Sequence, residues 1–414
     1  MPRSGVGSAG WGLESSTLNQ GEPVRLSVLG LVAPVLLSAA SRPHPAPTPL
    51  TTSITTVMYL VDRPDSLASF RAHARQISII APQSLHMDAQ GFVSGAVPAE
   101  VEAVAREAGI GVMPLVTNLG FSQPLMHTVL DAPAARARAI RYLLYLALRD
   151  GDIGIQFDYE NIHYTYRERF ARFFHEAAQA FHRRHLLLSI AVVGKYSDEP
   201  GAVSPGGFEN WSGVYDYAAI GRDADFVSVM AYPEHAGFSG PGPLAGVPWV
   251  TKIVDYAAAR MPARRISLGV PLYGEQWTAL SAGETAAPAA FAQDNAGPPR
   301  QQWKARATSF DRDVAPRLLQ TAPVWDGAAQ AFVISDQVAG HAVTLWYEDA
   351  RSLQAKLRLV RTADLAGISG WRLGQEDPAI WELLAHEPIR RLRLPRVVGS
   401  FDERSRRAAR LLDR

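Results

Sequence analysis

The chain has no cysteine, almost no net charge and few histidines. Without cysteine there is no disulfide, no thiol nucleophile and no thiolate metal ligand. A formal net charge of +1 gives no overall field that would attract nucleic acid or an acidic surface. The histidines, among them His182 and His185, show no metal-binding spacing, and no glycine-rich phosphate loop joins a strand to a helix. We therefore expect no metal, no cofactor and no nucleic-acid partner.

An apolar stretch near the N-terminus, Leu26–Ala40, is 15 residues long, whereas a membrane span needs about 20. Arg25 precedes it, and small residues at its end suit signal peptidase. We expect residues 1–40 to be a signal peptide or an atypical N-terminal segment, residues 41–52 to be a proline-rich linker, and the protein to be exported, periplasmic or extracellular, without a stable membrane span. Glu14 and Glu22 are unusual in such a leader, so the natural start lies downstream or the leader is atypical. The alternative is a disordered tail with an apolar patch.

From about Ser53 onward, short apolar runs alternate with helical patterns. A chain with 47% hydrophobic residues can bury a sizeable core, and strands alternating with helices favour a parallel sheet. Eight such runs predict an α/β fold, a closed (β/α)8 TIM barrel. The runs are Ile54–Val61, Ile77–Ala81, Gly111–Val116, Ile153–Phe157, Leu186–Val193, Phe226–Ala231, Ile266–Pro271 and Gly367–Trp371.

The regular spacing fails between the seventh run and the eighth. There we predict a small α+β insertion at about 278–345, with strands at Phe332–Ser335 and Ala342–Tyr347 around a turn. The barrel itself would cover residues 53–385. The tail, 386–414, is rich in arginine; a solvated helix or disorder is the plainer interpretation, and an anchor for an anionic wall polymer is the alternative.

Two carboxylates, Asp158 and Glu160, follow the fourth run directly. Residues two apart on a strand point to the same side, so Gln156, Asp158 and Glu160 would share one side. Neighbouring buried carboxylates drive their pKa values apart, which keeps one of them protonated near neutral pH. That chemistry suits cleavage of a glycosidic bond. The alternative is that the acids only cap the following helix.

Other polar and aromatic residues fall at the same end of the predicted barrel. Met230 and Tyr232 lie at the end of the sixth run, and Trp371 ends the eighth. The carboxyl ends of barrel strands carry the active site, and an aromatic face can stack on the C–H side of a sugar ring. Taken alone, Trp371 is as well explained as ordinary core.

Several segments together resemble glycoside hydrolase family 18, the chitinase-type barrels, and most closely the branch of bacterial spore-cortex peptidoglycan hydrolases. The resemblance covers residues 53–385. It is carried by Gly154–Ile162, by Val229–His235 with Gly242–Trp249, by Leu268–Gly274, by Trp346–Ser352 and by Gly370–Gly374.

The resemblance implies a retaining, substrate-assisted glycosidase. Glu160 would be the general acid, Asp158 would orient the substrate's 2-acetamido group, and Tyr232 would hydrogen-bond that group. It also implies substrate-binding residues, namely Gln156, Met230, Trp371, Tyr273, Asn118 and Tyr59. The expected partner is a polysaccharide or glycan that contains N-acetylglucosamine, and the expected state is a monomer.

Two departures from the family pattern bear on activity. Gln156 and Pro233 stand where the family has aspartate, although the spore branch often has an amide at the first of these positions. The leading hypothesis is cleavage of β-1,4 linkages in peptidoglycan or chitin-like polymers. Two alternatives remain: a catalytically silent sugar-binding barrel, and an endo-β-N-acetylglucosaminidase that acts on N-glycans.

Overall fold

The computed structural model describes residues 53–200, 207–281, 303–390 and 400–412. The expected leader, the linker and most of the Ala/Gly/Pro-rich stretch after Thr278 lie outside these residues. In the part of the chain that is described, we find no helix with the length and hydropathy needed to cross a membrane.

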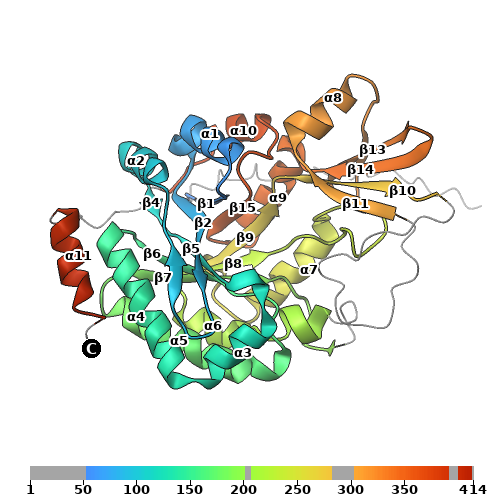
Figure 1. Ribbon diagram of the computed structural model, residues 1–414. Helices are drawn as coiled ribbons and strands as arrows, with labels where there is room; N and C mark the ends of the chain where they lie inside the picture. Colours follow the sequence, from blue (N-terminus) through green and yellow to red (C-terminus); the bar gives the residue numbers. More distant parts are fainter. Residues whose placement is uncertain (1–52, 201–206, 282–302, 391–399, 413–414) are drawn as a thin grey trace, which may run out of the picture. The chain divides into compact units, whose positions relative to one another are not determined.

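The predicted parallel barrel is confirmed (Figure 1). The strands run in the order β1-β15-β9-β8-β7-β6-β5-β2, and pairing of β1 with β2 closes the ring. The barrel strands are β1 (Thr55–Leu60), β2 (Ile79–Met87), β4 (Gly111–Val112), β5 (Leu115–Asn118), β6 (Gly154–Asp158), β7 (Leu187–Val193), β8 (Val227–Met230), β9 (Ile266–Pro271) and β15 (Gly367–Trp371).

Two of the predicted strands differ in extent. β2 continues six residues beyond the predicted end at Ala81, through Pro82 and a register shift between Gln83 and Leu85, and then pairs with the short strand β3 (Val93–Gly95). The third run is divided at Met113 and Pro114 into β4 and β5, both of which pair with β2. Proline cannot donate to a strand ladder, which explains both irregularities.

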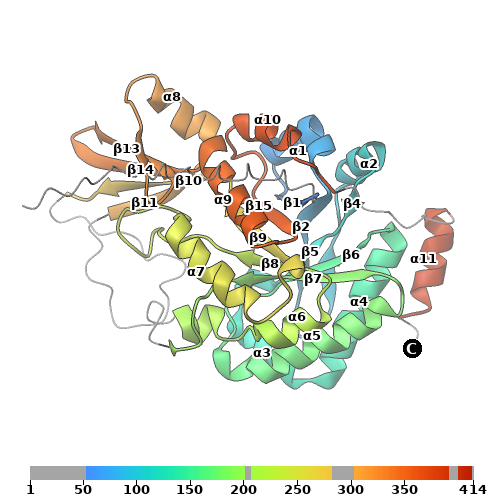
Figure 2. The same ribbon diagram turned by 180° about the vertical axis from the view of Figure 1, so that it is seen from behind.

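Helices surround the barrel on its outer side (Figures 1 and 2). They are α1 (Pro64–His73), α2 (Ala99–Ala108), α3 (Gln123–Asp131), α4 (Pro133–Asp150), α5 (Arg167–His182), α6 (Tyr217–Asp223), α7 (Val247–Ala258), α9 (Ala350–Thr362) and α10 (Ala379–Ala385). The phenylalanine stripe predicted for α5 is its buried face. Phe173 and Phe174 of α5 pack against Phe157 of β6 with ring centroids 5.5 and 5.8 Å apart. The odd-numbered side of β6 therefore faces the helices, and its even-numbered side faces the barrel interior.

A second, five-stranded antiparallel sheet lies between β9 and β15 in the chain, where the insertion is expected. It begins at Gly274, four residues before the expected position. Its elements are β10 (Gly274–Ala279), β11 (Trp303–Thr308), α8 (Ala315–Leu318), β12 (Val324–Asp326), β13 (Ala331–Val338) and β14 (His341–Tyr347). The last two contain the predicted strand pair. One face of the sheet packs on a small apolar core of Val314, Ile334, Leu345 and Tyr347.

The arginine-rich tail forms α11 (Phe401–Ala409), as the plainer interpretation has it, but this helix is not simply solvated. It packs along α4, where the Arg404 guanidinium donates to the carbonyl oxygen of Arg149 at 2.9 Å. The Arg149 guanidinium also lies 5.9 Å from the centroid of the Phe401 ring.

Candidate active site

The predicted site residues gather at one mouth of the barrel, because the barrel strands run parallel and the residues stand at strand ends. Asn118, Asp158, Met230 and Trp371 are the last residues of β5, β6, β8 and β15. Glu160 and Tyr232 follow two residues after β6 and β8, Tyr273 joins β9 to β10, and Tyr59 lies near the end of β1.

These residues divide into two groups by depth. Glu160, Met230, Tyr232, Tyr273 and Trp371 are half-buried and line the open mouth. Tyr59, Asn118, Gln156 and Asp158 are buried beneath them, each 4% exposed or less. A sugar at the mouth could therefore reach the first group directly, whereas direct contact of Asn118 or Gln156 with substrate stays a prediction.

Burial raises the pKa of both carboxylates. It raises the pKa of Asp158 to about 6, although the Gln83 amide, which donates to Asp158 Oδ2 at 3.5 Å, opposes the rise. Burial and the nearby charge of Asp158 together hold the pKa of Glu160 well above its ordinary value. Burial thus favours the protonated form of both carboxyl groups, and the charge of Asp158 adds to this effect at Glu160, which suits Glu160 to the role of a general acid beside a charge-stabilising partner.

The backbone around Glu160 is fixed by side chains from other elements. The Asn118 amide donates to the Glu160 carbonyl oxygen and accepts from the Glu160 N–H, both at 3.0 Å. The Tyr215 hydroxyl donates to the carbonyl oxygen of Tyr159 at 2.8 Å. Lys195, itself fully buried, donates to the carbonyl oxygen of Tyr215 at 2.8 Å. Glu160 is thereby held on both sides of its own peptide unit.

A layer of uncharged polar groups lies below the carboxylates. The Gln156 amide donates to Ser228 Oγ at 3.1 Å. Ser228 is 2.8 Å from Ser369 Oγ, which is 2.6 Å from Ser267 Oγ. These residues come from β6, β8, β15 and β9, so four strands contribute to one hydrogen-bonded layer.

Aromatic rings form the walls of the mouth. Trp371 packs on Tyr59 with centroids 5.6 Å apart, and Tyr232 meets Tyr273 edge to face at 6.5 Å. Burial, with the neighbouring phenols and the charges of Asp158 and Glu160, raises the pKa of Tyr232 well above its ordinary value, so its hydroxyl stays a hydrogen-bond donor. Gly269 of β9 has no room for a side chain, because a Cβ there would lie 2.5 Å from the Val229 carbonyl oxygen and 3.1 Å from Tyr232 Cε1.

A cavity of about 250 Å³ lies between the ends of β1 and β2 and the segment that follows β3, and none of the predicted site residues lines it. Gln83, which hydrogen-bonds Asp158, is one of its lining residues, together with Leu60, Asp62, His86 and Pro98.

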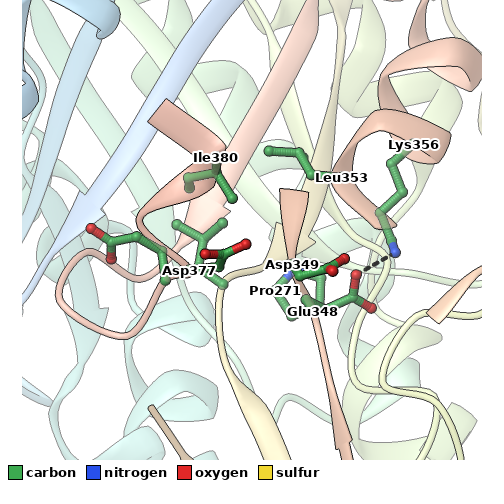
Figure 3. A pocket seen from close by; sticks show the side chains of 9 residues that line it. Pro271, Glu348, Asp349, Leu353, Lys356, Asp377 and Ile380 are labelled. Atoms are coloured by element: carbon green, nitrogen blue, oxygen red, sulfur yellow. Dashed lines mark hydrogen bonds and ion pairs between the residues drawn. The ribbon is translucent and has the colours of Figure 1, made fainter. Parts of the chain in front are cut away.

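A second, much smaller cavity of about 10 Å³ lies where the inserted sheet returns to the barrel (Figure 3). Lys356 of α9 forms a buried ion pair there with Glu348 at 2.6 Å. Asp377 accepts from the backbone N–H groups of Ala350 and Ala379, both at 3.0 Å, and so caps the starts of α9 and α10. This cluster ties the insertion to the barrel and is separate from the catalytic mouth.

Sequence analysis missed several residues of the site. Gln83 lies in the part of β2 that follows Pro82, where the apolar run had been expected to end. Tyr215 and Lys195 lie in the connection after β7, which has no periodic pattern. The serines at 228, 267 and 369 do carry a signal, since each is the polar residue in an otherwise apolar strand. Over the described residues, no group of three or more His, Asp or Glu side chains is arranged to hold a metal ion.

Comparison with known proteins gives a consistent result. The family model described as "Glycosyl hydrolases family 18" matches residues 99–376. A cortical fragment-lytic enzyme of Bacillus subtilis is 32% identical over 295 residues, which cover 69% of this chain and 62% of that protein. An uncharacterized glycosylase of the same organism is 24% identical over 334 residues, covering 80% of this chain and 90% of that protein.

Solved structures have the same architecture. The spore cortex-lytic enzyme SleL of Bacillus megaterium superposes with a TM-score of 0.71 and 22% identity, covering 84% of this chain and 76% of that one. A chitinase of Chromobacterium violaceum superposes with a TM-score of 0.69 and 25% identity, covering 80% of this chain and 98% of that one.

Proposed function

Because the chain belongs to glycoside hydrolase family 18, we propose that it hydrolyses β-1,4 linkages at N-acetylglucosamine in peptidoglycan or chitin-like polymers. The observation that carries the proposal is the carboxylate pair at the barrel mouth, in which burial and the charge of Asp158 raise the pKa of Glu160. The aromatic rings at the same mouth support a glycan substrate, because an aromatic face can stack on a sugar ring.

In the proposed reaction, Glu160 gives its proton to the leaving glycosidic oxygen as the bond to the anomeric carbon breaks. The oxygen of the substrate's own 2-acetamido group attacks that carbon, and a cyclic intermediate forms. Asp158 and the Tyr232 hydroxyl orient the acetamido group and stabilise the positive charge that develops on it. Glu160 then takes a proton from water, and the water oxygen attacks the anomeric carbon. This attack opens the cyclic intermediate and releases the sugar with its β configuration retained.

Several observations bear on the substrate. The name of the Bacillus subtilis relative, a cortical fragment-lytic enzyme, favours peptidoglycan fragments as the substrate. The structural similarity to a chitinase favours chitin oligomers. An endo-β-N-acetylglucosaminidase acting on N-glycans would need the same two carboxylates. The silent-barrel alternative is the weaker one, because Glu160 is present and its backbone is held by Asn118 on both sides.

The first experiment incubates the protein with purified peptidoglycan, chitin oligomers and a glycoprotein, and identifies the products by mass spectrometry. Glu160→Gln should lower turnover about 10²–10⁴-fold while the fold and sugar binding persist. A variant that keeps turnover within tenfold of wild type would remove Glu160 from the role of acid. Glu168→Gln, on the outer helix α5, is the matched control and should keep full turnover.

The stereochemical course tests the mechanism separately from the substrate. Proton NMR of freshly formed product, recorded before mutarotation, should show the β anomer. Initial release of the α anomer would overturn substrate assistance. A fully deacetylated oligomer should not be cleaved, because it lacks the nucleophile.

Export of the protein is also part of the proposal, and it rests on the apolar stretch Leu26–Ala40 with Arg25 before it. Expression of the full chain in a bacterial host, followed by fractionation and N-terminal sequencing, tests it. An uncleaved protein that stays in the cytoplasm would contradict it.

A further inference from the structure

Glu275, in the inserted sheet, is an acidic side chain outside the catalytic pair that is almost fully buried. Glu275 of β10 is 7% exposed, and in the described part of the chain its carboxyl group has no hydrogen bond or ion pair. Burial raises its pKa to about 7, and Arg306 opposes that rise. Arg306 itself pairs with Asp313 at 2.8 Å and with the Gln276 amide at 3.0 Å, on the other face of the sheet. The carboxyl oxygens of Glu275 are not among the buried side-chain atoms that lack a hydrogen-bond partner, so the tip of this side chain reaches solvent and a ligand can contact it.

The register of the inserted sheet fixes the direction in which Glu275 points. Its directly opposite neighbours are Ala307 of β11 and Trp346 of β14, and Tyr273 and Trp277 lie two residues to either side on the same face. The Trp277 indole N–H lies 3.3 and 3.2 Å from the carbonyl oxygens of Ala236 and Ser239, in the connection that leaves β8. The face that carries Glu275 therefore turns toward the connection that holds Tyr232, and the opposite face packs on the insertion's own core.

Tyr273 links Glu275 to the catalytic mouth. Its ring meets that of Tyr232 at 6.5 Å, and the charges of Glu275 and Glu348 contribute to raising the pKa of the Tyr273 phenol. Glu348 is already paired with Lys356, whereas Glu275 is not paired. Glu275 thus lies close to Tyr273, whose ring contacts that of Tyr232 at the mouth.

We propose that Glu275 binds a primary ammonium group on the unit next to the one that reacts, so that the enzyme prefers substrates carrying a free amine there. This inference rests on the proposed function. The reacting sugar itself must be N-acetylated, so the amine belongs elsewhere, either to an unacetylated glucosamine or to an amino acid of a peptide branch. An ammonium group suits the place because Asp158, Glu160 and Glu275 are all acidic, and because the neighbouring Tyr273 and Trp346 rings attract cations.

The test compares matched substrates that differ by one acetyl group. One series consists of chitin oligomers with a single glucosamine beside an N-acetylated cleavage site. The other consists of peptidoglycan fragments whose peptide amine is free or acetylated. We expect wild-type kcat/KM to favour the amine form by about tenfold or more at low salt in one series, which also identifies the source of the amine.

Glu275→Gln keeps the shape of the side chain and should reduce that preference ratio to about one. Asp311→Asn removes one negative charge from an exposed position in the insertion and should keep the wild-type ratio. Calorimetry of binding to Glu160→Gln enzyme at pH 7, in buffers of different ionisation enthalpy, should show a net exchange of protons with the amine form and none with the acetylated form, because formation of the ion pair changes the protonation of the amine and of Glu275. The same measurement with Glu275→Gln added should show none.

Equal wild-type kcat/KM for amine and acetylated forms in both series would overturn the inference. So would a preference that survives in Glu275→Gln. Failure of the proposed function is a different result, since the wild-type enzyme would then cleave neither form; the calorimetric comparison would still decide whether Glu275 recognises the ammonium group.

Discussion

Removal of the Asn118 side chain should disable the enzyme without unfolding it. The two hydrogen bonds from this amide are made to the N–H and C=O groups of Glu160 itself. In Asn118→Ala both backbone groups lose their partners, and the Tyr159–Glu160 peptide unit is held only by the hydrogen bond from the Tyr215 hydroxyl to its carbonyl oxygen. The Glu160 carboxyl would keep its chemistry but lose its fixed position relative to the glycosidic oxygen.

The size of the effect follows from the geometry. A buried polar group left without a partner costs about 1–3 kcal/mol, so two such groups give about 2–6 kcal/mol. Glu160 is only half-buried, so water can reach the vacated groups, and we expect the free energy of unfolding to fall near the lower limit, by about 2 kcal/mol. Turnover should fall much further, about 10²-fold, because a misplacement of about 1 Å at a reacting group has that effect.

The assay measures kcat and KM on an N-acetylglucosamine oligomer together with thermal unfolding. The matched control is Ser122→Ala, which removes the N-cap of α3, where Ser122 Oγ accepts from the Leu125 N–H at 3.4 Å. It should lower stability by about 1 kcal/mol and leave kcat unchanged. If Asn118→Ala keeps kcat within threefold of wild type, or loses it only in proportion to unfolding, the positioning role is refuted.

Three further outcomes are expected. Tyr232→Phe should lower kcat more than it raises KM, because its hydrogen bond strengthens as charge builds on the acetamido group; a change in KM alone would show that the role is wrong. The Asp158 pKa rises on folding from 3.8 to about 6, so the folded state binds this proton more tightly than the unfolded state does. The contribution of Asp158 to the free energy of unfolding is therefore fully present below about pH 4 and is lost as the pH rises through about 6. Asp158→Asn should therefore raise the free energy of unfolding at pH 8 by about 3 kcal/mol but leave it unchanged at pH 4, which unfolding titrations at both pH values would check. A thiazoline that mimics the cyclic intermediate should inhibit at concentrations well below KM, and inhibition no stronger than that by product would contradict substrate assistance.

Much of the barrel was predictable because its strands are short apolar runs buried on both sides, and such runs are visible in a single sequence. The alternation in β6 placed Phe157 against the helices and Asp158 in the interior, as observed. The candidate acids followed from the rule that parallel strands bring their carboxyl ends to one mouth.

Other features of the site depend on contacts that no local pattern encodes. Gln83 reaches Asp158 only because β2 continues past a proline and shifts register, and Tyr215 reaches Tyr159 from 56 residues away. Asn118 was expected to bind substrate. Its position at the end of a strand does not reveal that its amide nitrogen and oxygen both hydrogen-bond the backbone of Glu160. Glu275 is unremarkable in the sequence, since its burial arises from the packing of an inserted sheet.

The inserted sheet leaves and rejoins the barrel at residues that face each other. Gly274 begins β10, Tyr347 ends β14, and the two are directly paired. Paired residues on antiparallel strands lie about 5 Å apart, so the two ends of the insertion are as close together as the two ends of a short turn. Insertions with such closely spaced ends can lengthen, shorten or be exchanged without strain on the host domain. On the proposed function, recombination of this one module could therefore change substrate preference, while Glu160, Asp158 and the groups that hold them would stay unchanged in the barrel.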